Sequence, residues 1–233
     1  ALLASALSAG QARAAAADSQ SSAAEKQRAL IQILESNAPP GEQAVACKRL
    51  AIYGTEDAVP ALTPLLSNPD LASWARIALE AIPGPAADAA LRGALDKVQG
   101  RLLVGVINSI AVRRDPKAVS ELIKKLKDAD PEVASAAAVA LGRIGGADAA
   151  KALTQSLGDA PVAVLPAVAE GCILCAEWSI AQGKPADAVK LYDKVRAANV
   201  PQQKQLEAIR GAILARQSAG LPLLLEQLRS PDK

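Results

Sequence analysis

Apolar residues recur every three or four positions within short segments of this chain, and the segments themselves recur every 31 residues. Spacing of the first kind indicates amphipathic helices. Self-similarity at the longer period predicts stacked units that bury their apolar faces on one another. The predicted fold class is therefore all-α, a right-handed α-solenoid of stacked antiparallel helix pairs. The positions that repeat in steps of 31 are Leu91, Leu122 and Leu153; Leu95, Leu126 and Leu157; Ala87, Ala118 and Ala149; and Ala78, Ser109, Ala140 and Gly171.

The clearest unit begins at Asp115-Pro116 and carries an apolar stripe at helical spacing up to residue 126. Its second helix starts with Asp130 as the cap and Pro131 at the first helical position. That helix is predicted to run to residue 144 and to end at the glycine pair 145–146. Similar helix pairs are predicted at 25–35 with 42–52, at 56–66 with 71–82, and at 86–98 with 101–112.

The sequence of this unit reads D-P-x-V, an alanine-rich stretch, A-L-G-x-I-G and a short step to the next helix. It resembles the HEAT repeat, and more narrowly the short bacterial HEAT-like repeat named after phycobilisome lyases. The resemblance is strongest over residues 115–157, holds by spacing from residue 55, and is looser towards the end. The family often has Arg or Lys directly after the Val of the second helix, where this chain has Ala134 and, in an earlier copy, Ala72.

The period changes after Gly158. A longer helix is predicted over 161–182, in which Pro166 either causes a kink or marks the true start. Residues 183–217 resemble a tetratricopeptide hairpin, on the Gly, Ala and Tyr spacing of GKPADAVKLY, and the step from Ala149 to Ala188 is 39 residues. A further helix is expected over 221–228. We expect about six to seven helix pairs over residues 25–233, with a truncation at the C-terminus.

Composition narrows the chemistry that this chain can perform. Apolar residues make up 51% and aromatic residues 2%, with no Phe, Met or His. A core of Ala and Leu suits closely packed helices and argues against a sheet. Without His there is no imidazole base, no His ligand for a metal or haem, and no catalytic triad of the usual kind. A net charge of +2 gives no strong attraction to nucleic acid or anionic membranes.

The first residues have the composition of an export signal. The stretch 1–10 (ALLASALSAG) is small and apolar, and an A-x-A cleavage site follows, after Ala14. We interpret residues 1–24 as the remnant of a secretory signal with an Ala/Ser-rich linker, and we expect an extracytoplasmic location. The alternative is a frayed, Ala-rich leading helix. No later stretch reaches the ~18 apolar residues that a membrane helix needs.

The most tempting motif is Cys172-Ile-Leu-Cys175. A haem-attachment motif is excluded because Ala176 stands where that motif requires His. A zinc site is disfavoured because the chain offers too few further Cys or His ligands. A redox pair would place the first Cys at a helix N-terminus, whereas both are predicted mid-helix. Cys172 continues the 31-residue column of Leu79, Ile110 and Leu141, and Cys47 fills the same place one unit before Leu79. We therefore interpret the three cysteines as core residues, and a free reactive thiol or a bridge remains the alternative.

Basic residues recur on the predicted second helices, which line the concave face in superhelical repeats of this kind. They could form a positive stripe, although glutamates interrupt the row and a mixed-charge solvated face is the competing interpretation. Trp74 is an outsized side chain at a position that is usually small. We favour its burial in the core over exposure as a binding anchor. The candidate partner-binding residues are Lys48, Arg49, Trp74, Arg76, Arg101, Arg113, Arg114, Arg143 and Arg210.

The function predicted from these patterns is a non-catalytic scaffold that binds a protein or peptide, with no catalytic, metal or cofactor site. The first alternative, implied by the resemblance, is a lyase-like HEAT protein that holds a chromophore or its acceptor protein. The second is nucleic-acid binding through the arginine row, which the signal-like N-terminus disfavours. HEAT-like metal hydroxylases are excluded because the iron sites of that family use His-Glu pairs.

Overall fold

The computed structural model describes residues 23–229, and within that range it contains helices and turns but no strand. The chain divides at Lys97–Val98 into two compact units. The predicted signal remnant and linker covers residues 1–24, of which residues 1–22 lie outside the described residues. None of the described helices is both long enough and apolar enough to cross a membrane. The all-α fold of packed helix pairs is as predicted.

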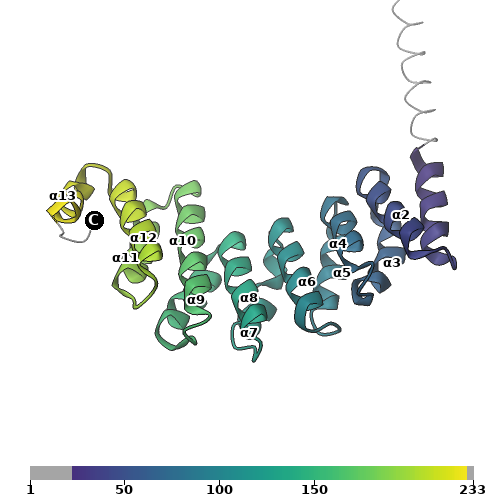
Figure 1. Cartoon of the computed structure of the whole chain (residues 1–233). Coiled ribbons are helices and arrows are strands. Elements are labelled where there is room, and N and C mark those ends of the chain that lie inside the picture. Colours follow the sequence, from purple (N-terminus) through teal and green to yellow (C-terminus); the bar gives the residue numbers. More distant parts are fainter. Residues whose placement is uncertain (1–22, 230–233) are drawn as a thin grey trace, which may run out of the picture. The chain divides into compact units, whose positions relative to one another are not determined.

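The first unit contains two second helices, α2 and α4, with the first helices and shorter segments beside them (Figure 1). α2 packs along α4, and α5 contacts the shorter segments. The helix predicted over 56–66 is broken into three, because Pro60 and Pro64 lack the N–H groups that a continuous α-helix needs. In order, the elements are the helix 23–35, α2 (Pro40–Tyr53), η1 (Glu56–Ala58), α3 (Val59–Leu62), η2 (Thr63–Ser67), α4 (Ala72–Ala81) and α5 (Pro85–Ala94).

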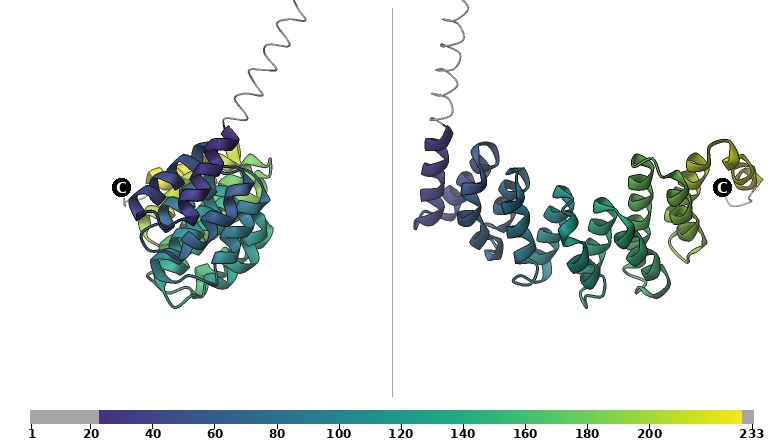
Figure 2. Two further views of the ribbon diagram at one scale, coloured as in Figure 1. Left: turned by 90° about the vertical axis from the view of Figure 1, so that its right-hand side faces the viewer. Right: turned by 180° about the vertical axis from the view of Figure 1, so that it is seen from behind.

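In the second unit, long helices pack in succession, α6 on α8 and α8 on α10, while α7 and α9 pack beside them. The same order is visible from behind (Figure 2). α11 and α12 form a closely packed pair after α10, where the hairpin is predicted. The elements are α6 (Gly100–Arg113), η3 (Pro116–Ala118), α7 (Val119–Lys125), α8 (Pro131–Ile144), α9 (Ala147–Asp159), α10 (Leu165–Ala181), α11 (Pro185–Ala197), α12 (Gln202–Arg216), η4 (Gln217–Gly220) and α13 (Leu221–Arg229).

The predicted turn chemistry is confirmed. The Asp130 carboxylate accepts a hydrogen bond from the backbone N–H of Glu132 at 2.9 Å, and Asp115 accepts one from Lys117 at 3.0 Å. Both satisfy N–H groups that a helix start leaves unpaired. Pro166 stands in the first turn of α10, so it marks the start of that helix and does not kink it.

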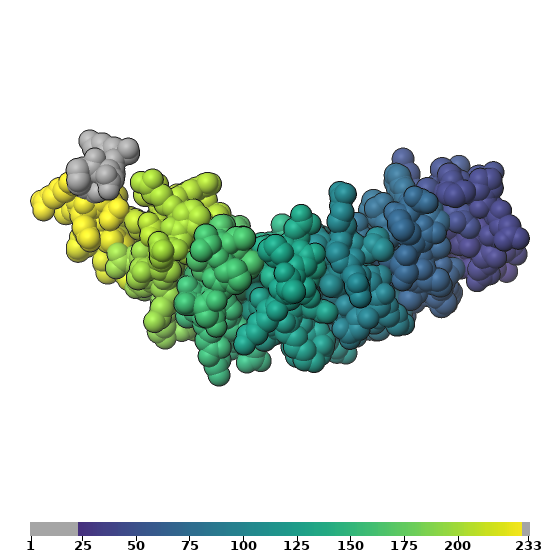
Figure 3. All heavy atoms as spheres, turned by 60° about the horizontal axis from the view of Figure 1, so that its bottom comes forward, coloured from purple at the N-terminus to yellow at the C-terminus, as the bar shows by residue number. Residues whose placement is uncertain are grey.

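The 31-residue columns form the core. Leu79 of the first unit and Ile110, Leu141 and Cys172 of the second are all at most 1% exposed. The small-residue column is equally buried, because it lies where one second helix meets the next. A Cβ atom added to Gly171 would stand 2.5 Å from the carbonyl oxygen of Ala138, so only glycine permits this approach of α10 to α8. Figure 3 shows the side chains of successive helices of this unit, in teal and green, closing against one another.

Side chains also link successive helices of the first unit. Buried Gln27 donates a hydrogen bond to the Thr55 hydroxyl at 3.0 Å and accepts one from the Thr55 backbone N–H. The Glu56 carboxylate accepts a hydrogen bond from the backbone N–H of Ala86 at 3.2 Å, at the start of α5. A carboxylate at that position also interacts favourably with the helix dipole. The acidic residues near these turns therefore have structural roles.

Candidate functional site

In the first unit, the helices α2 and α4 each expose large apolar side chains on one side. The buried residues of these helices, such as Ala46 and Leu50 on α2, lie on the opposite side. Val45 and Ile77 occupy the same repeat position, 32 residues apart, and are 49% and 46% exposed. Equal register and equal exposure place them on one face of this unit. We call this surface the α2–α4 face; it comprises Val45, Lys48, Arg49, Ile52, Tyr53, Trp74 and Ile77.

Trp74 belongs to this face, and the favoured prediction that it is buried in the core was wrong. Its side chain is 37% exposed, whereas Ala75 and Ala78 of the same helix are fully buried. At 100° per residue, Trp74 lies about 40° from buried Ala78 and about 60° from Ile77, so it stands at the boundary between the core and the exposed side of α4. The alternative weighed from the sequence, an exposed aromatic side chain, is the one that the structure shows.

Basic side chains accompany the apolar ones. Lys48 and Arg49 are exposed on α2 beside Val45 and Ile52. Arg76 is only half-exposed, and burial lowers the pKa of its guanidinium although the nearby Glu80 carboxylate acts in the opposite direction. Arg76 therefore interacts within its own helix, and the exposed positive charge of this face comes from Lys48 and Arg49.

The basic residues of this face and Trp74 are among the candidates predicted from the sequence, whereas Val45, Ile52, Tyr53 and Ile77 are not. Val45 and Ile77 stand two positions before the core residues Cys47 and Leu79. Two helical positions correspond to about 200° of rotation, so residues at that offset from a core column face away from the core. A search for large apolar residues at this offset would have found the face.

The second unit distributes its arginines instead of gathering them. Arg101 is exposed at the start of α6, while Arg113 and Arg114 stand at its other end. At 1.5 Å per residue these two ends are about 18 Å apart. Arg143 is exposed near the end of α8, and Arg210 is exposed on α12. The five candidate arginines of this unit therefore do not form one cluster.

The three cysteines are buried free thiols. Burial raises the pKa of Cys47 to about 11 and those of Cys172 and Cys175 to about 12. A thiol at these pKa values is not a nucleophile near neutral pH, because the thiolate is the reactive form. The prediction that the C-x-x-C motif fills a core column is confirmed. Within residues 23–229 no group of three or more Cys, Asp or Glu side chains has a metal-binding arrangement.

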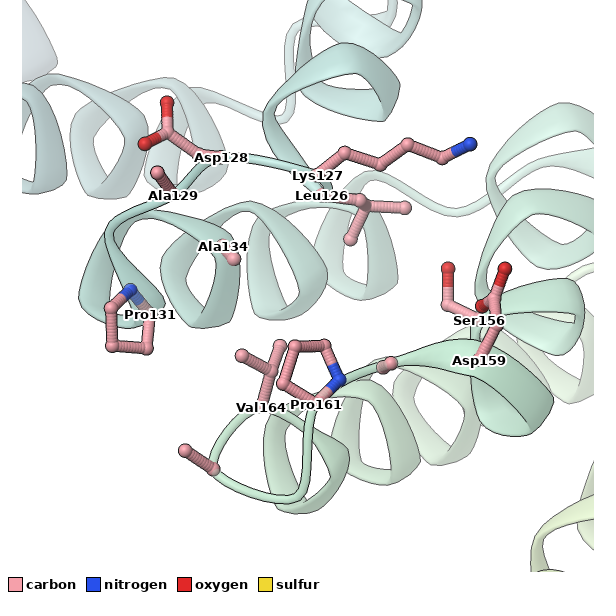
Figure 4. Close-up of a pocket in the computed structure, with 12 residues that line it drawn as sticks. Leu126, Lys127, Asp128, Ala129, Pro131, Ala134, Ser156, Asp159, Pro161 and Val164 are labelled. Atoms are coloured by element: carbon pink, nitrogen blue, oxygen red, sulfur yellow. The ribbon is translucent and has the colours of Figure 1, made fainter.

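One hollow of the second unit lies between the turn before α8 and the segment before α10. Its volume is about 570 Å³. Pro131 and Ala134 line it from α8, and Pro161 and Val164 line it from the segment before α10 (Figure 4). Its centre is apolar, and charged side chains occur only towards the rim.

A second hollow of about 470 Å³ lies between α9, α10 and α11. The side chain of Trp178, on α10, forms part of its lining. Trp178 is half-buried, and its ring covers Gly145 so closely that an added Cβ there would stand 2.4 Å from it. Gly145 therefore permits the close approach of the indole ring.

Comparison with known proteins supports the repeat assignment. Residues 101–172, from α6 into α10, match the family model for HEAT repeats. No curated protein sequence matches the chain.

The solved structures that match this chain include two engineered proteins and a lyase complex. One engineered protein is 21% identical, with a TM-score of 0.49 over 84% of this chain and 97% of its own. A second engineered protein is 22% identical, with a TM-score of 0.46 over 87% of this chain and 64% of its own. The complex of CpcE and CpcF of phycocyanin lyase from Nostoc sp. PCC7120 is 18% identical, with a TM-score of 0.43 over 85% of this chain and 80% of its own.

Proposed function

We propose that this chain, which carries HEAT repeats at residues 101–172, is a non-catalytic scaffold that binds a protein partner through the α2–α4 face of its first unit. The observation that carries this proposal is the exposure of five large apolar side chains on one face. Val45, Ile52, Tyr53, Trp74 and Ile77 are between 37% and 72% exposed. A contiguous apolar surface with a polar rim is typical of protein interaction sites.

The composition of the face indicates the chemistry of the partner. Trp and Tyr supply large contact areas and are enriched at positions that dominate binding energy. Lys48 and Arg49 lie beside the apolar residues, and Lys26 places its ammonium 5.4 Å from the centre of the Tyr53 ring. A segment with apolar side chains and neighbouring carboxylates would complement this arrangement.

Site-specific photocrosslinking in the source cells tests the proposal. A benzophenone amino acid at Ile77 is expected to yield a defined crosslinked partner. The same amino acid at Ala89, which is exposed on α5 away from the face, serves as the matched control. Ile52→Asp, at the most exposed position of the face, is expected to abolish the crosslink. Equal crosslinking from Ala89, or an unchanged crosslink with Ile52→Asp, would exclude this face as the binding site.

We also propose that the protein is exported, which the apolar stretch 1–10 and the A-x-A sequence ending at Ala14 support. Expression of the full reading frame followed by N-terminal sequencing tests this directly. A mature chain in the extracytoplasmic fraction that begins at Ala15 is expected. An uncleaved chain retained in the cytoplasm would contradict the proposal.

A further inference from the structure

The pocket at Trp178 lies where two helices are held apart. α9 and α11 each pack on α10, whereas they meet one another only narrowly. The hollow between them is lined by Ala147 and Ala150 of α9, by Leu191 of α11 and by the ring of Trp178. We call it the Trp178 pocket. Its interior is apolar and aromatic, and its volume of about 470 Å³ lies within the range of small-molecule sites.

The extension of α10 explains why an aromatic ring lines this pocket. Cys175 occupies the repeat position of Ile144, which is the last residue of α8. α10 continues for six residues beyond that position, to Ala181, and Trp178 stands on this extension. The hollow between α7 and α9, one repeat earlier, has no aromatic side chain in its lining. The Trp178 ring therefore distinguishes this pocket from its counterpart in the preceding repeat.

The charges around the pocket are mainly positive. Lys151, Lys184 and Lys190 line it and are exposed, against the single carboxylate of Asp187. Asp187 is paired with Lys190 at 3.1 Å. Lys151 and Lys184 make no ion pair with another described residue. Two uncompensated cations therefore stand at an aromatic pocket.

From these features we propose that the Trp178 pocket binds a small planar aromatic anion, independently of the partner surface on α2 and α4. The aromatic ring of the ligand packs against the Trp178 ring, in the offset or edge-to-face arrangement that aromatic pairs prefer. Its carboxylate, sulfonate or phosphate group lies near the ammonium groups of Lys151 and Lys184. The Gln155 amide supplies a hydrogen-bond donor along α9.

The two tryptophans give a direct readout of the site. Trp74 and Trp178 are the only Trp residues and lie in different units, so their indole N–H resonances report the two regions separately. The probe is 8-anilinonaphthalene-1-sulfonate, titrated into the full chain labelled with ¹⁵N. We expect the Trp178 resonance to shift and saturate while the Trp74 resonance stays in place. A Trp178 resonance that does not move over the titration would overturn the proposal.

Charge selectivity is tested with the double variant Lys151→Gln/Lys184→Gln and with the uncharged probe N-phenyl-1-naphthylamine. Unit charges about 6 Å apart in water change an affinity about threefold each, so the dissociation constant of the sulfonate should rise about tenfold. Binding of the uncharged probe should not change. Lys194→Gln, on α11 outside the lining, is the matched control and should leave both affinities unchanged.

Two outcomes of this comparison would overturn the anionic specificity. One is an unchanged affinity of the double variant for the sulfonate. The other is an equal loss for the charged and the uncharged probe, which would mean that only the apolar cavity binds. Because all three lysines are exposed, these substitutions should preserve the fold, and an unchanged far-UV circular dichroism spectrum verifies this.

Discussion

Gly142→Ala tests a close contact between the backbones of α8 and α10 in the second unit. A Cβ atom at this position would lie 2.6 Å from the carbonyl oxygen of Gly171 and 3.0 Å from the Cβ of Leu174. Contacts between carbon and a carbonyl oxygen ordinarily begin near 3.3 Å. The substitution therefore forces α8 and α10 apart by about 0.7 Å at their point of contact. We expect it to destabilise the second unit.

The magnitude follows from two opposing effects. Replacing Gly by Ala inside a helix is worth up to about 1 kcal/mol in favour of the folded state. A gap of 0.5–1 Å, however, removes about a quarter to a half of the dispersion energy of each separated contact, and overpacked cores lose about 1–3 kcal/mol. Backbone atoms cannot move aside as a flexible side chain can, so we expect a net loss of about 1–3 kcal/mol.

Gly158→Ala is the matched control, because this glycine is also in a helix of the second unit but has no neighbour within 4 Å of an added Cβ. It should stabilise the unit by about 0.4–1 kcal/mol. Urea unfolding followed by far-UV circular dichroism and by Trp178 emission in a Trp74→Phe background measures both variants. The contact geometry would be refuted if the Gly142→Ala variant had an unfolding midpoint at the same urea concentration as the parent protein, or at a higher one.

Three further predictions concern the helix cap and the buried thiols. Asp130→Ala should cost about 1 kcal/mol by urea unfolding, since the Glu132 N–H loses its acceptor, and Asp130→Asn should restore most of this. At pH 8 a thiol reagent should react far more slowly with Cys47, Cys172 and Cys175 in the native protein than in denaturant. In denaturant, three equivalents of reagent should react. Rapid labelling of the native protein would contradict the burial of the thiols. The pKa values of these thiols in the folded protein are about 11–12, above the ordinary value of 9.0. The thiols therefore do not lower the free energy of unfolding below pH 9. As the pH rises from 9 towards 12, the free energy of unfolding should fall by up to ~1.4 kcal/mol per pH unit for each thiol. Denaturant unfolding between pH 8 and pH 11 should show this decline, and a triple Cys→Ala variant should show a weaker one.

The core could be predicted from the sequence because burial in a repeat stack follows register. Each column position meets the same environment in every unit, so that Leu79, Ile110 and Leu141 predict the burial of Cys172. The turn positions could be predicted equally well from Asp followed by Pro. Asp caps the helix, and Pro suits the first helical position because the backbone N–H that it lacks would have no partner there. These features depend on local chemistry and on the repeat alone.

Register is a weaker guide to the binding surfaces. Trp74 shares its column with Gly105, which is buried, and with Ala136, yet Trp74 itself is exposed. A small side chain is covered easily by its neighbours, whereas an indole ring at the same backbone position extends beyond them. The exposure of the apolar residues on the α2–α4 face therefore depends on the size of the side chain at each position. The repeat register does not determine that size.

A break in the repeat period supplies the aromatic wall of the pocket. Hollows also lie between the first helices of regular repeats, as between α7 and α9, but the lining there holds no aromatic side chain. The extension of α10 beyond Cys175 adds Trp178, and two lysines that pair with no described acid line the same hollow. An exposed cation beside an aromatic wall contributes little to folding, because surface charges in water interact weakly. A cavity of this composition is better explained by ligand binding than by the packing of the stack.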